Sequence, residues 1–262
     1  MKSKLYYLII FAIMLMACGG AGEPTAISTD PLVPTTEPPP LPSDTPQPPP
    51  PTETDPPPTN TPVPDPWLFR DDFDGSLGEG WEWYAEVPEK WNLSDVPGFL
   101  RIIAQNGGLN GGEPHNLLLY PVPAGDFVIS TRMNFTPTSN FQFAGLIVIQ
   151  SETSFSQFGR AYAACDAAFC VGNGIYTDNI LEGQYLGSNL ATSVLEPTIT
   201  YLRLEKRGNV YTGFFSADGV SWIEIGSNTN DMAPLKVGLV AHQAHEEEIA
   251  ADFDYFMIEA IP

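Results

Sequence analysis

The segment DFVISTRMNF, residues 126–135, decides the fold class because its apolar side chains recur at every second position. An extended chain points successive side chains to opposite faces. The alternation gives one apolar and one polar face, made of Phe127, Ile129, Met133 and Phe135 against Ser130, Arg132 and Asn134. We predict a β-strand here, with its apolar face against a core.

Residues 67–262 repeat this short-strand pattern and show no long helical period. In 200–206, Leu202 and Leu204 are expected to face inward. The run FQFAGLIVIQ at 141–150 is more continuously apolar, which is typical of a central strand covered on both faces. Further strands are predicted at 68–73, 81–85, 90–94, 99–103, 115–120, 156–163, 209–216, 221–226, 235–241 and 251–259. About a dozen strands in one domain predict two packed antiparallel sheets.

Two tight turns are visible between these strands. Residues 207–209, Arg-Gly-Asn, join the strands at 200–206 and 209–216 as a hairpin. Residues 216–222 form a second hairpin, in which Asp218-Gly219 supplies the positive φ and Trp222 returns to the core. This turn is similar to the Asp-box of sugar-active β-proteins, but one residue is missing between Asp and Trp. We therefore interpret it as a structural turn.

The first 18 residues, MKSKLYYLIIFAIMLMAC, have the pattern of an export signal. Lys2 and Lys4 precede an apolar run of about a dozen residues, which is too short to span a membrane. The run ends in Leu-Met-Ala-Cys18, which resembles the lipobox of bacterial lipoproteins. The resemblance implies removal of residues 1–17 and a lipid anchor on Cys18. The alternative is an ordinary cleaved signal with a chance cysteine.

Residues 18–66 are dominated by Pro, Thr and acidic residues and contain no aromatic side chain. Such a segment cannot bury enough apolar surface to offset the entropy of ordering, so we predict an extended, disordered linker. It carries seven acidic residues and no Lys or Arg. The whole chain has a formal charge of -21, which disfavours binding to nucleic acid and to anionic lipid head groups. We expect an extracytoplasmic protein, exposed at the surface and held to the membrane only by its lipid.

A family resemblance runs through the remaining domain, residues 67–262. It is carried, in order, by Asp71–Gly75, Trp81–Trp83, Trp91–Leu93, Pro97–Ile102, Ser216–Trp222, Val237–Leu239 and Ala251–Phe256. Together these segments resemble the concanavalin A-like domain at the C-terminus of β-xylosidases. The resemblance implies a jelly-roll β-sandwich whose first and last strands are neighbours. In the xylosidases this domain lies beside a catalytic propeller; here the predicted linker precedes it, so that accessory role is not carried over.

Catalytic residues are not apparent. Glycanases that share this sandwich carry a Glu-x-Asp-x-x-Glu run, which sets two carboxylates about 5 Å apart. The sequence lacks this run, and Asp252 lies outside its spacing from the acidic residues 246–248. We interpret those three glutamates as a solvated loop and predict no catalytic residue. A glycoside hydrolase is the least favoured of the functions considered.

Cys165 and Cys170 are the cysteines that remain after Cys18. In an exported protein they are expected to form a disulfide. The loop between them offers too few ligands for a metal site.

Two further sets of residues were considered for metal ions. His242 and His245 lie close in sequence, in what we take to be a loop before the last strand. No cofactor is expected, although calcium is found near the terminal strands of some sandwiches of this class. Asp72, Asp74 and Asp252 are the carboxylates to test for it, and turn hydrogen bonds are the role we favour for them.

Aromatic residues near the start of the domain are the candidates for binding sugar. Trp83, Tyr84 and Trp91 can stack on the C–H faces of sugar rings, and the competing interpretation, which we favour for most of them, is core packing. These aromatic residues, together with the association of the family with xylan degradation, favour the hypothesis that the domain is a non-catalytic module that binds a glycan. The alternative is an envelope domain that binds protein or has a structural role.

Overall fold

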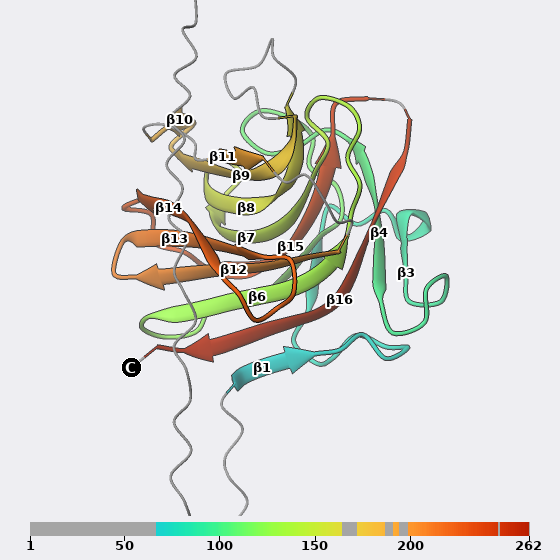
Figure 1. Cartoon of the computed structure of the whole chain (residues 1–262), viewed down its shortest axis with the longest axis horizontal. Helices are drawn as coiled ribbons and strands as arrows, with labels where there is room; N and C mark the ends of the chain where they lie inside the picture. Colours follow the sequence, from blue (N-terminus) through green and yellow to red (C-terminus); the bar gives the residue numbers. More distant parts are fainter. Residues whose placement is uncertain (1–66, 164–171, 187–190, 194–198, 246, 262) are drawn as a thin grey trace, which may run out of the picture. The chain divides into compact units, whose positions relative to one another are not determined.

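The computed structural model describes residues 67–163, 172–186, 191–193, 199–245 and 247–261. These residues form sixteen strands and one short 3-10 helix, η1 (Pro88–Lys90), and no α-helix (Figure 1). Within the same ranges, no helix is long and apolar enough to span a bilayer. The all-β prediction is confirmed. Cys18, the predicted linker 18–66, Cys165 and Cys170 lie outside the described residues.

The strands form two sheets, which we call sheet A and sheet B. Sheet A contains β1 (Trp67–Asp71), β3 (Trp91–Asn92), β4 (Leu100–Asn106), β6 (Phe127–Asn134), β12 (Ile199–Arg207), β13 (Val210–Ser216), β14 (Ile223–Thr229) and β16 (Ile249–Ala260). Sheet B contains β2 (Glu82–Tyr84), β5 (Leu117–Pro121), β7 (Phe143–Ser151), β8 (Ser154–Ala163), β9 (Gly172–Leu181), β10 (Gln184–Tyr185), β11 (Ala191–Ser193) and β15 (Lys236–Gln243).

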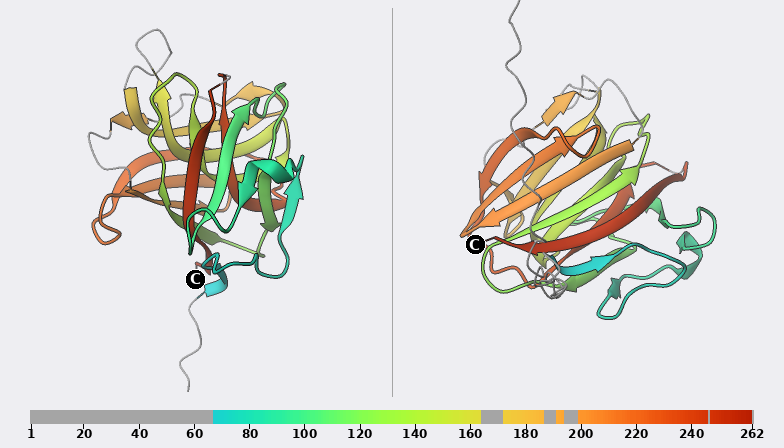
Figure 2. Two further views of the ribbon diagram at one scale, coloured as in Figure 1. Left: turned by 90° about the vertical axis from the view of Figure 1, so that its right-hand side faces the viewer. Right: turned by 60° about the horizontal axis from the view of Figure 1, so that its bottom comes forward.

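Strand β16 organises sheet A. One of its edges pairs with β6, and the other pairs first with β4 and then with β1. The first and last strands are therefore antiparallel neighbours, as the family resemblance implied (Figure 2). Strand β4 also links the two sheets, because its end forms a short parallel pairing with β15.

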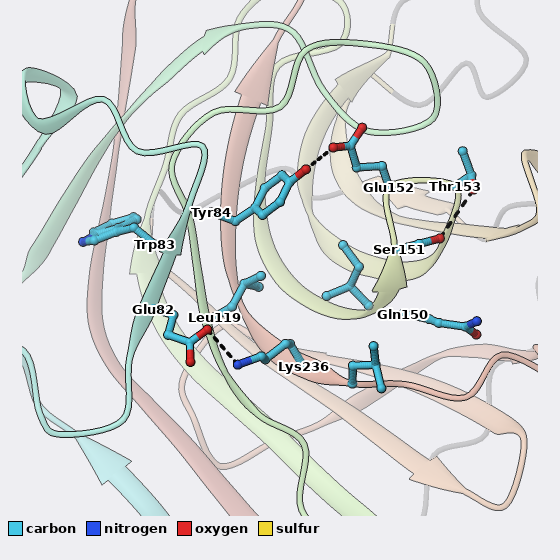
Figure 3. A pocket seen from close by; sticks show the side chains of 11 residues that line it. Glu82, Trp83, Tyr84, Leu119, Gln150, Ser151, Glu152, Thr153 and Lys236 are labelled. Carbon is cyan, nitrogen blue, oxygen red and sulfur yellow. Dashed lines mark hydrogen bonds and ion pairs between the residues drawn. The ribbon is translucent and has the colours of Figure 1, made fainter.

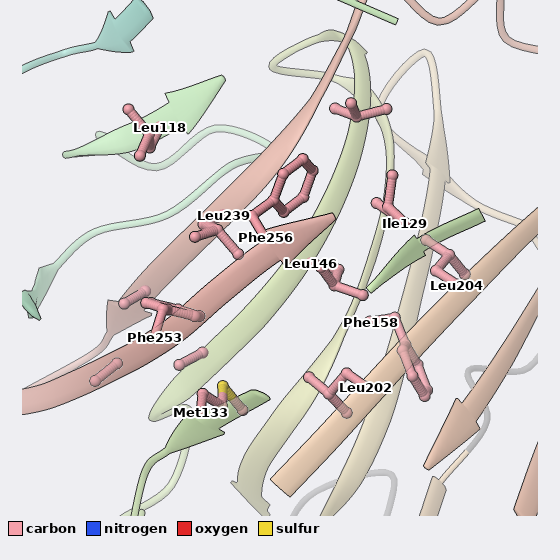
Figure 4. Close-up of a cluster of buried hydrophobic side chains, with 14 of the residues drawn as sticks. Leu118, Ile129, Met133, Leu146, Phe158, Leu202, Leu204, Leu239, Phe253 and Phe256 are labelled. Atoms are coloured by element: carbon pink, nitrogen blue, oxygen red, sulfur yellow. The ribbon is translucent and has the colours of Figure 1, made fainter. Parts of the chain in front are cut away.

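The main hydrophobic core lies between the two sheets (Figure 4). The alternation in β6 holds, since Phe127, Ile129 and Met133 are all fully buried in this core. Leu202 and Leu204 of β12 join them, as predicted. The core therefore forms where the period-two pattern placed apolar side chains on facing strands.

A second hydrophobic cluster covers the other side of sheet B, which we call its outer face. Strand β7 contributes Leu146 and Val148 to the main core, and Phe143, Ile147 and Ile149 to this second cluster. Burial on both faces confirms the prediction from its continuous apolar run. Strands β7, β8 and β9 are visibly curved in Figure 1. Gly145 and Gly159 face each other on the outer face, where an added Cβ would meet neighbouring backbone oxygens at 2.4 and 2.2 Å.

Three details differ from the sequence-based expectations. Strand β9, which is ten residues long, and the short strands β10 and β11 were not predicted. His242 lies within β15 rather than in a loop. Trp222 is only partly buried and belongs to neither hydrophobic cluster, because β14 is the outer strand of sheet A on that side. The 216–222 turn is otherwise as predicted, with Gly219 at φ 76°.

The carboxylate of Asp218 closes this turn by accepting hydrogen bonds from the backbone N–H groups of Val220 and Ser221 at 2.8 and 2.7 Å. These bonds hold the pKa of Asp218 below its ordinary value. The hydrogen bonds that the Asp218 carboxylate accepts all come from residues of the turn itself. This supports the interpretation of residues 216–222 as a structural turn.

Candidate functional site

A pocket of about 540 Å³ opens on the outer face of sheet B, and we call it the Tyr84 pocket (Figure 3). Residues directly opposite in an antiparallel pair share one face. Tyr84 pairs with Leu117 of the second hydrophobic cluster, so β2 directs its phenol onto the outer face. Leu119 and Ile149 supply buried apolar lining, whereas Tyr84 and Leu235 remain 41% and 61% exposed.

Polar groups rim this apolar lining. The Tyr84 hydroxyl donates a hydrogen bond to Oε1 of Glu152 in the β7–β8 turn, and this bond raises the pKa of the phenol. Lys236 Nζ lies 2.8 Å from Oε2 of Glu82 across the β2 side of the pocket. The pocket therefore has an apolar floor, and charged or hydrogen-bonding groups surround its opening. It suits an amphipathic ligand without requiring a reactive group.

The two tryptophans predicted as sugar-binding residues are oriented differently from Tyr84. Trp83 lines part of the pocket, but its indole points away from Tyr84 in Figure 3 and packs against the main core. Its ring lies against Trp91, with centroids 4.7 Å apart and an interplanar angle of 34°. The Trp91 indole N–H donates to Glu86 Oε1 at 3.1 Å. Of the three predicted aromatic residues, Tyr84 alone presents its ring on the outer face.

The three predicted calcium candidates are not brought into one cluster. Asp72 pairs with Arg70 at 2.5 Å, and Asp252 pairs with Arg101 at 2.7 Å on sheet A. Asp74 is exposed in the loop after β1. Among the residues that the structure describes, no group of three or more His, Cys, Asp or Glu side chains could hold a metal ion.

The neighbouring Asp71, which the sequence did not single out as a site, organises that loop. Its buried carboxylate accepts hydrogen bonds from Phe73 N at 2.9 Å, Gly78 N at 2.7 Å and Trp81 Nε1 at 2.7 Å. Phe73 is fully buried at φ 54°, a conformation rarely adopted by an aromatic residue. Asp71 therefore fixes the segment that leads into β2.

The two histidines of the 241–246 segment point to different partners. The ring of His242 stacks on Phe143, with centroids 5.1 Å apart, and its Nε2 lies 3.3 Å from Gln157 Oε1. His245 Nε2 lies 2.6 Å from the carbonyl oxygen of Asn140. Glu248 of the acidic run pairs with Lys90, and Glu246 lies outside the described residues.

The fold and the ordered segments identify the family. Residues 70–259 match the family model of the β-xylosidase C-terminal concanavalin A-like domain. The chain belongs to this family. The match spans both sheets, from β1 to β16, and includes every strand that lines the Tyr84 pocket.

The proteins similar to this domain include two longer enzymes and one protein that the match covers almost completely. A xylan 1,3-β-xylosidase of Vibrio sp. is 26% identical over 185 residues, which cover 65% of this chain and 33% of that protein. The GH43 protein BlXynB of Bacillus licheniformis has a TM-score of 0.66 at 20% identity, covering 73% of this chain and 39% of the enzyme. A β-glucanase of Bacillus licheniformis has a TM-score of 0.52 at 8% identity, covering 74% of this chain and 98% of that protein. The chain thus spans about a third of the length of the curated relative that it matches.

Proposed function

We propose that this chain is a non-catalytic glycan-binding protein and that the Tyr84 pocket is its binding site. The observation that carries the proposal is the exposed ring of Tyr84 above an apolar lining and beside the carboxylate of Glu152. A sugar ring has an apolar C–H face and a polar hydroxyl edge. The pocket offers a partner for each, because an aromatic ring packs against the face and a carboxylate accepts from the edge.

The family supports a glycan as the ligand class, because its model describes a domain of β-xylosidases and the curated relative named above is a xylan 1,3-β-xylosidase. Association with such enzymes does not specify a site, so the argument for this chain rests on its own residues. The carboxylates of the pocket are Glu82 and Glu152; the first pairs with Lys236 and the second accepts from Tyr84. These pairings support a role for both carboxylates in binding rather than in catalysis.

Substitution of Tyr84 tests the site. Tyr84→Ala removes the exposed ring, and we expect it to weaken glycan binding by at least about tenfold, measured by calorimetry with the glycan that the wild-type chain binds. Leu68→Ala is the control, since Leu68 is also an exposed apolar residue but lies in β1 of sheet A. Equal affinities of wild-type and Tyr84→Ala would exclude this pocket.

We also propose that Cys18 anchors the protein outside the cytoplasm, with its domain held from the membrane by residues 18–66. Metabolic labelling with a radioactive fatty acid should label the wild-type chain and leave Cys18→Ser unlabelled. The double variant of Cys165 and Cys170 to serine is the control and should keep the label. Label retained by Cys18→Ser would place the lipid elsewhere and contradict the proposal.

A further inference from the structure

A second pocket lies on the same outer face of sheet B, and we call it the His242 pocket. Its volume is about 230 Å³. Gln157 of β8, Asp178 of β9 and His242 of β15 contribute side chains to it from three strands. The glycine-rich loop 107–112 and the segment that ends at Phe141 complete its walls.

Three polar side chains form a connected row on its floor. Gln157, which is 4% exposed, donates from Nε2 to Asp178 Oδ2 at 2.7 Å. Gln157 Oε1 can only accept, so His242 donates to it from Nε2 over 3.3 Å. The proton of the neutral imidazole therefore lies on Nε2, and Nδ1 is left as an acceptor beside Gly108. The floor presents acceptors at fixed positions where a hydroxyl group can donate.

Two aromatic rings stand at the rim of the same pocket. Tyr185 is 61% exposed and Phe141 is 59% exposed. Phe141 has φ 66°, a left-handed backbone conformation that is strained for a residue other than glycine. A buried network holds it there, since Gln142 Oε1 accepts from the backbone of Thr138 and Ser139 at 2.7 and 3.1 Å. The backbone of Phe141 is thus held in a strained conformation that keeps its apolar ring exposed beside the polar floor of the pocket.

The chemistry of the lining selects the class of ligand. None of the described residues that line this pocket is Lys or Arg, and Asp178 lies on its floor. A carboxylate ligand would meet repulsion without a cationic partner. The volume is below the range of about 300 to 1,000 Å³ that is typical of pockets for drug-sized molecules. The pocket therefore suits one small neutral ring that carries hydroxyl groups.

We propose that the His242 pocket is a second sugar site, which takes a single neutral sugar ring between Phe141, Tyr185 and the Gln157–Asp178–His242 row. This inference rests on the proposed glycan-binding function and adds a site and a ligand class to it. The two pockets adjoin, because Asn110 of the glycine-rich loop donates its N–H to the carbonyl oxygen of Glu152 at 2.9 Å. Asn110 lines the His242 pocket and Glu152 lines the Tyr84 pocket.

The imidazole resonances of His242 provide a readout specific to this pocket. We would titrate the full ¹⁵N-labelled chain with xylose, glucose and galactose, and with glucuronate and galacturonate as anionic probes, using His242→Gln for assignment. At least one neutral sugar should shift the His242 resonances, and the uronates should bind at least about tenfold more weakly. Phe141→Asn and Tyr185→Ala should each weaken this binding at least about tenfold, whereas Leu68→Ala in β1 of sheet A should leave it unchanged.

Phe141→Asn also separates binding from folding. Asparagine tolerates positive φ better than phenylalanine, so its thermal unfolding midpoint should be equal to or above that of the wild type. If no neutral sugar shifts the His242 resonances while Tyr84-dependent glycan binding persists, this inference is wrong and the proposed function stands. If the chain binds no glycan at all, both fail. Uronates that bind as tightly as the neutral sugars would overturn the ligand class.

Discussion

Asp71 determines the shape of the loop between β1 and β2. Its carboxylate accepts three hydrogen bonds at 2.7 to 2.9 Å, including one from the backbone of Phe73, whose side chain is fully buried. The adjacent Asp72 is exposed and pairs only locally, with Arg70. Two acidic neighbours in one motif therefore differ in energetic importance, because hydrogen bonds to a buried charge are much stronger than an exposed ion pair.

We expect Asp71→Ala to lower the free energy of unfolding by about 3 kcal/mol, since it leaves buried donors without an acceptor. Asp72→Ala is the matched control and should cost less than about 1 kcal/mol. Urea denaturation of both variants measures the difference. Similar losses in the two variants would show that Asp71 does not organise the loop as described.

His242 makes the stability of the domain depend on pH. Burial lowers the pKa of its imidazole from 6.5 to about 4, because desolvation disfavours the charged form. Between these values the unfolded chain binds a proton that the folded chain does not. The contribution of His242 is therefore complete above pH 6.5 and is lost as the pH falls toward 4. It amounts to at most about 3 kcal/mol, because the ring keeps some access to water through the pocket.

Asp178 acts in the opposite direction, because burial raises the pKa of its carboxyl and the folded chain then holds that proton more tightly. We therefore predict how the difference in unfolding free energy between the wild type and His242→Gln changes with pH, and not the full pH dependence of either protein. Unfolding free energies of both should converge as the pH falls from 6.5 to about 4. A constant difference across this window, measured by urea denaturation, would contradict the burial of a neutral imidazole.

At the scale of elements, strands with a clear apolar alternation were predictable and strand β9 was not. In β6 and β12 the alternation places apolar residues against one core. Strand β9 reads GNGIYTDNIL, and its glycine, asparagine and aspartate residues are rare in strands. It forms nevertheless because it pairs with β8 along its whole length and buries Ile175 and Ile180 on opposite faces. Such long-range pairing leaves little signal in the local sequence.

Strand β16 should be indispensable, because it pairs with β1, β4 and β6. A chain that stops after Asp254 loses Phe256 and Ile258, both buried in the main core, together with the pairing to β1. We expect this truncation to abolish cooperative thermal unfolding, as followed by circular dichroism. A chain that stops after Ala260 is the control and should unfold cooperatively. A folded product from the shorter chain would mean that β16 contributes less than its pairing indicates.

At the scale of the whole molecule, sequence and structure contribute different parts of the account. The predicted anchor at Cys18 and the linker come from sequence, and the sandwich and its family are shown by the fold and the family match. The sequence pointed to Tyr84 as an aromatic residue but could not separate it from Trp83, which faces the other side of β2. The His242 pocket could not be predicted, because Gln157, Asp178 and His242 meet only through the pairing of distant strands.

The central claim is that the chain binds a glycan and leaves it intact. The most direct test applies the full chain to an array of plant and microbial glycans and then incubates each bound glycan with the chain in solution. We predict selective binding to one or more neutral glycans, which are recovered at their original length. Absence of binding to every glycan, or recovery of shortened products, would contradict the account.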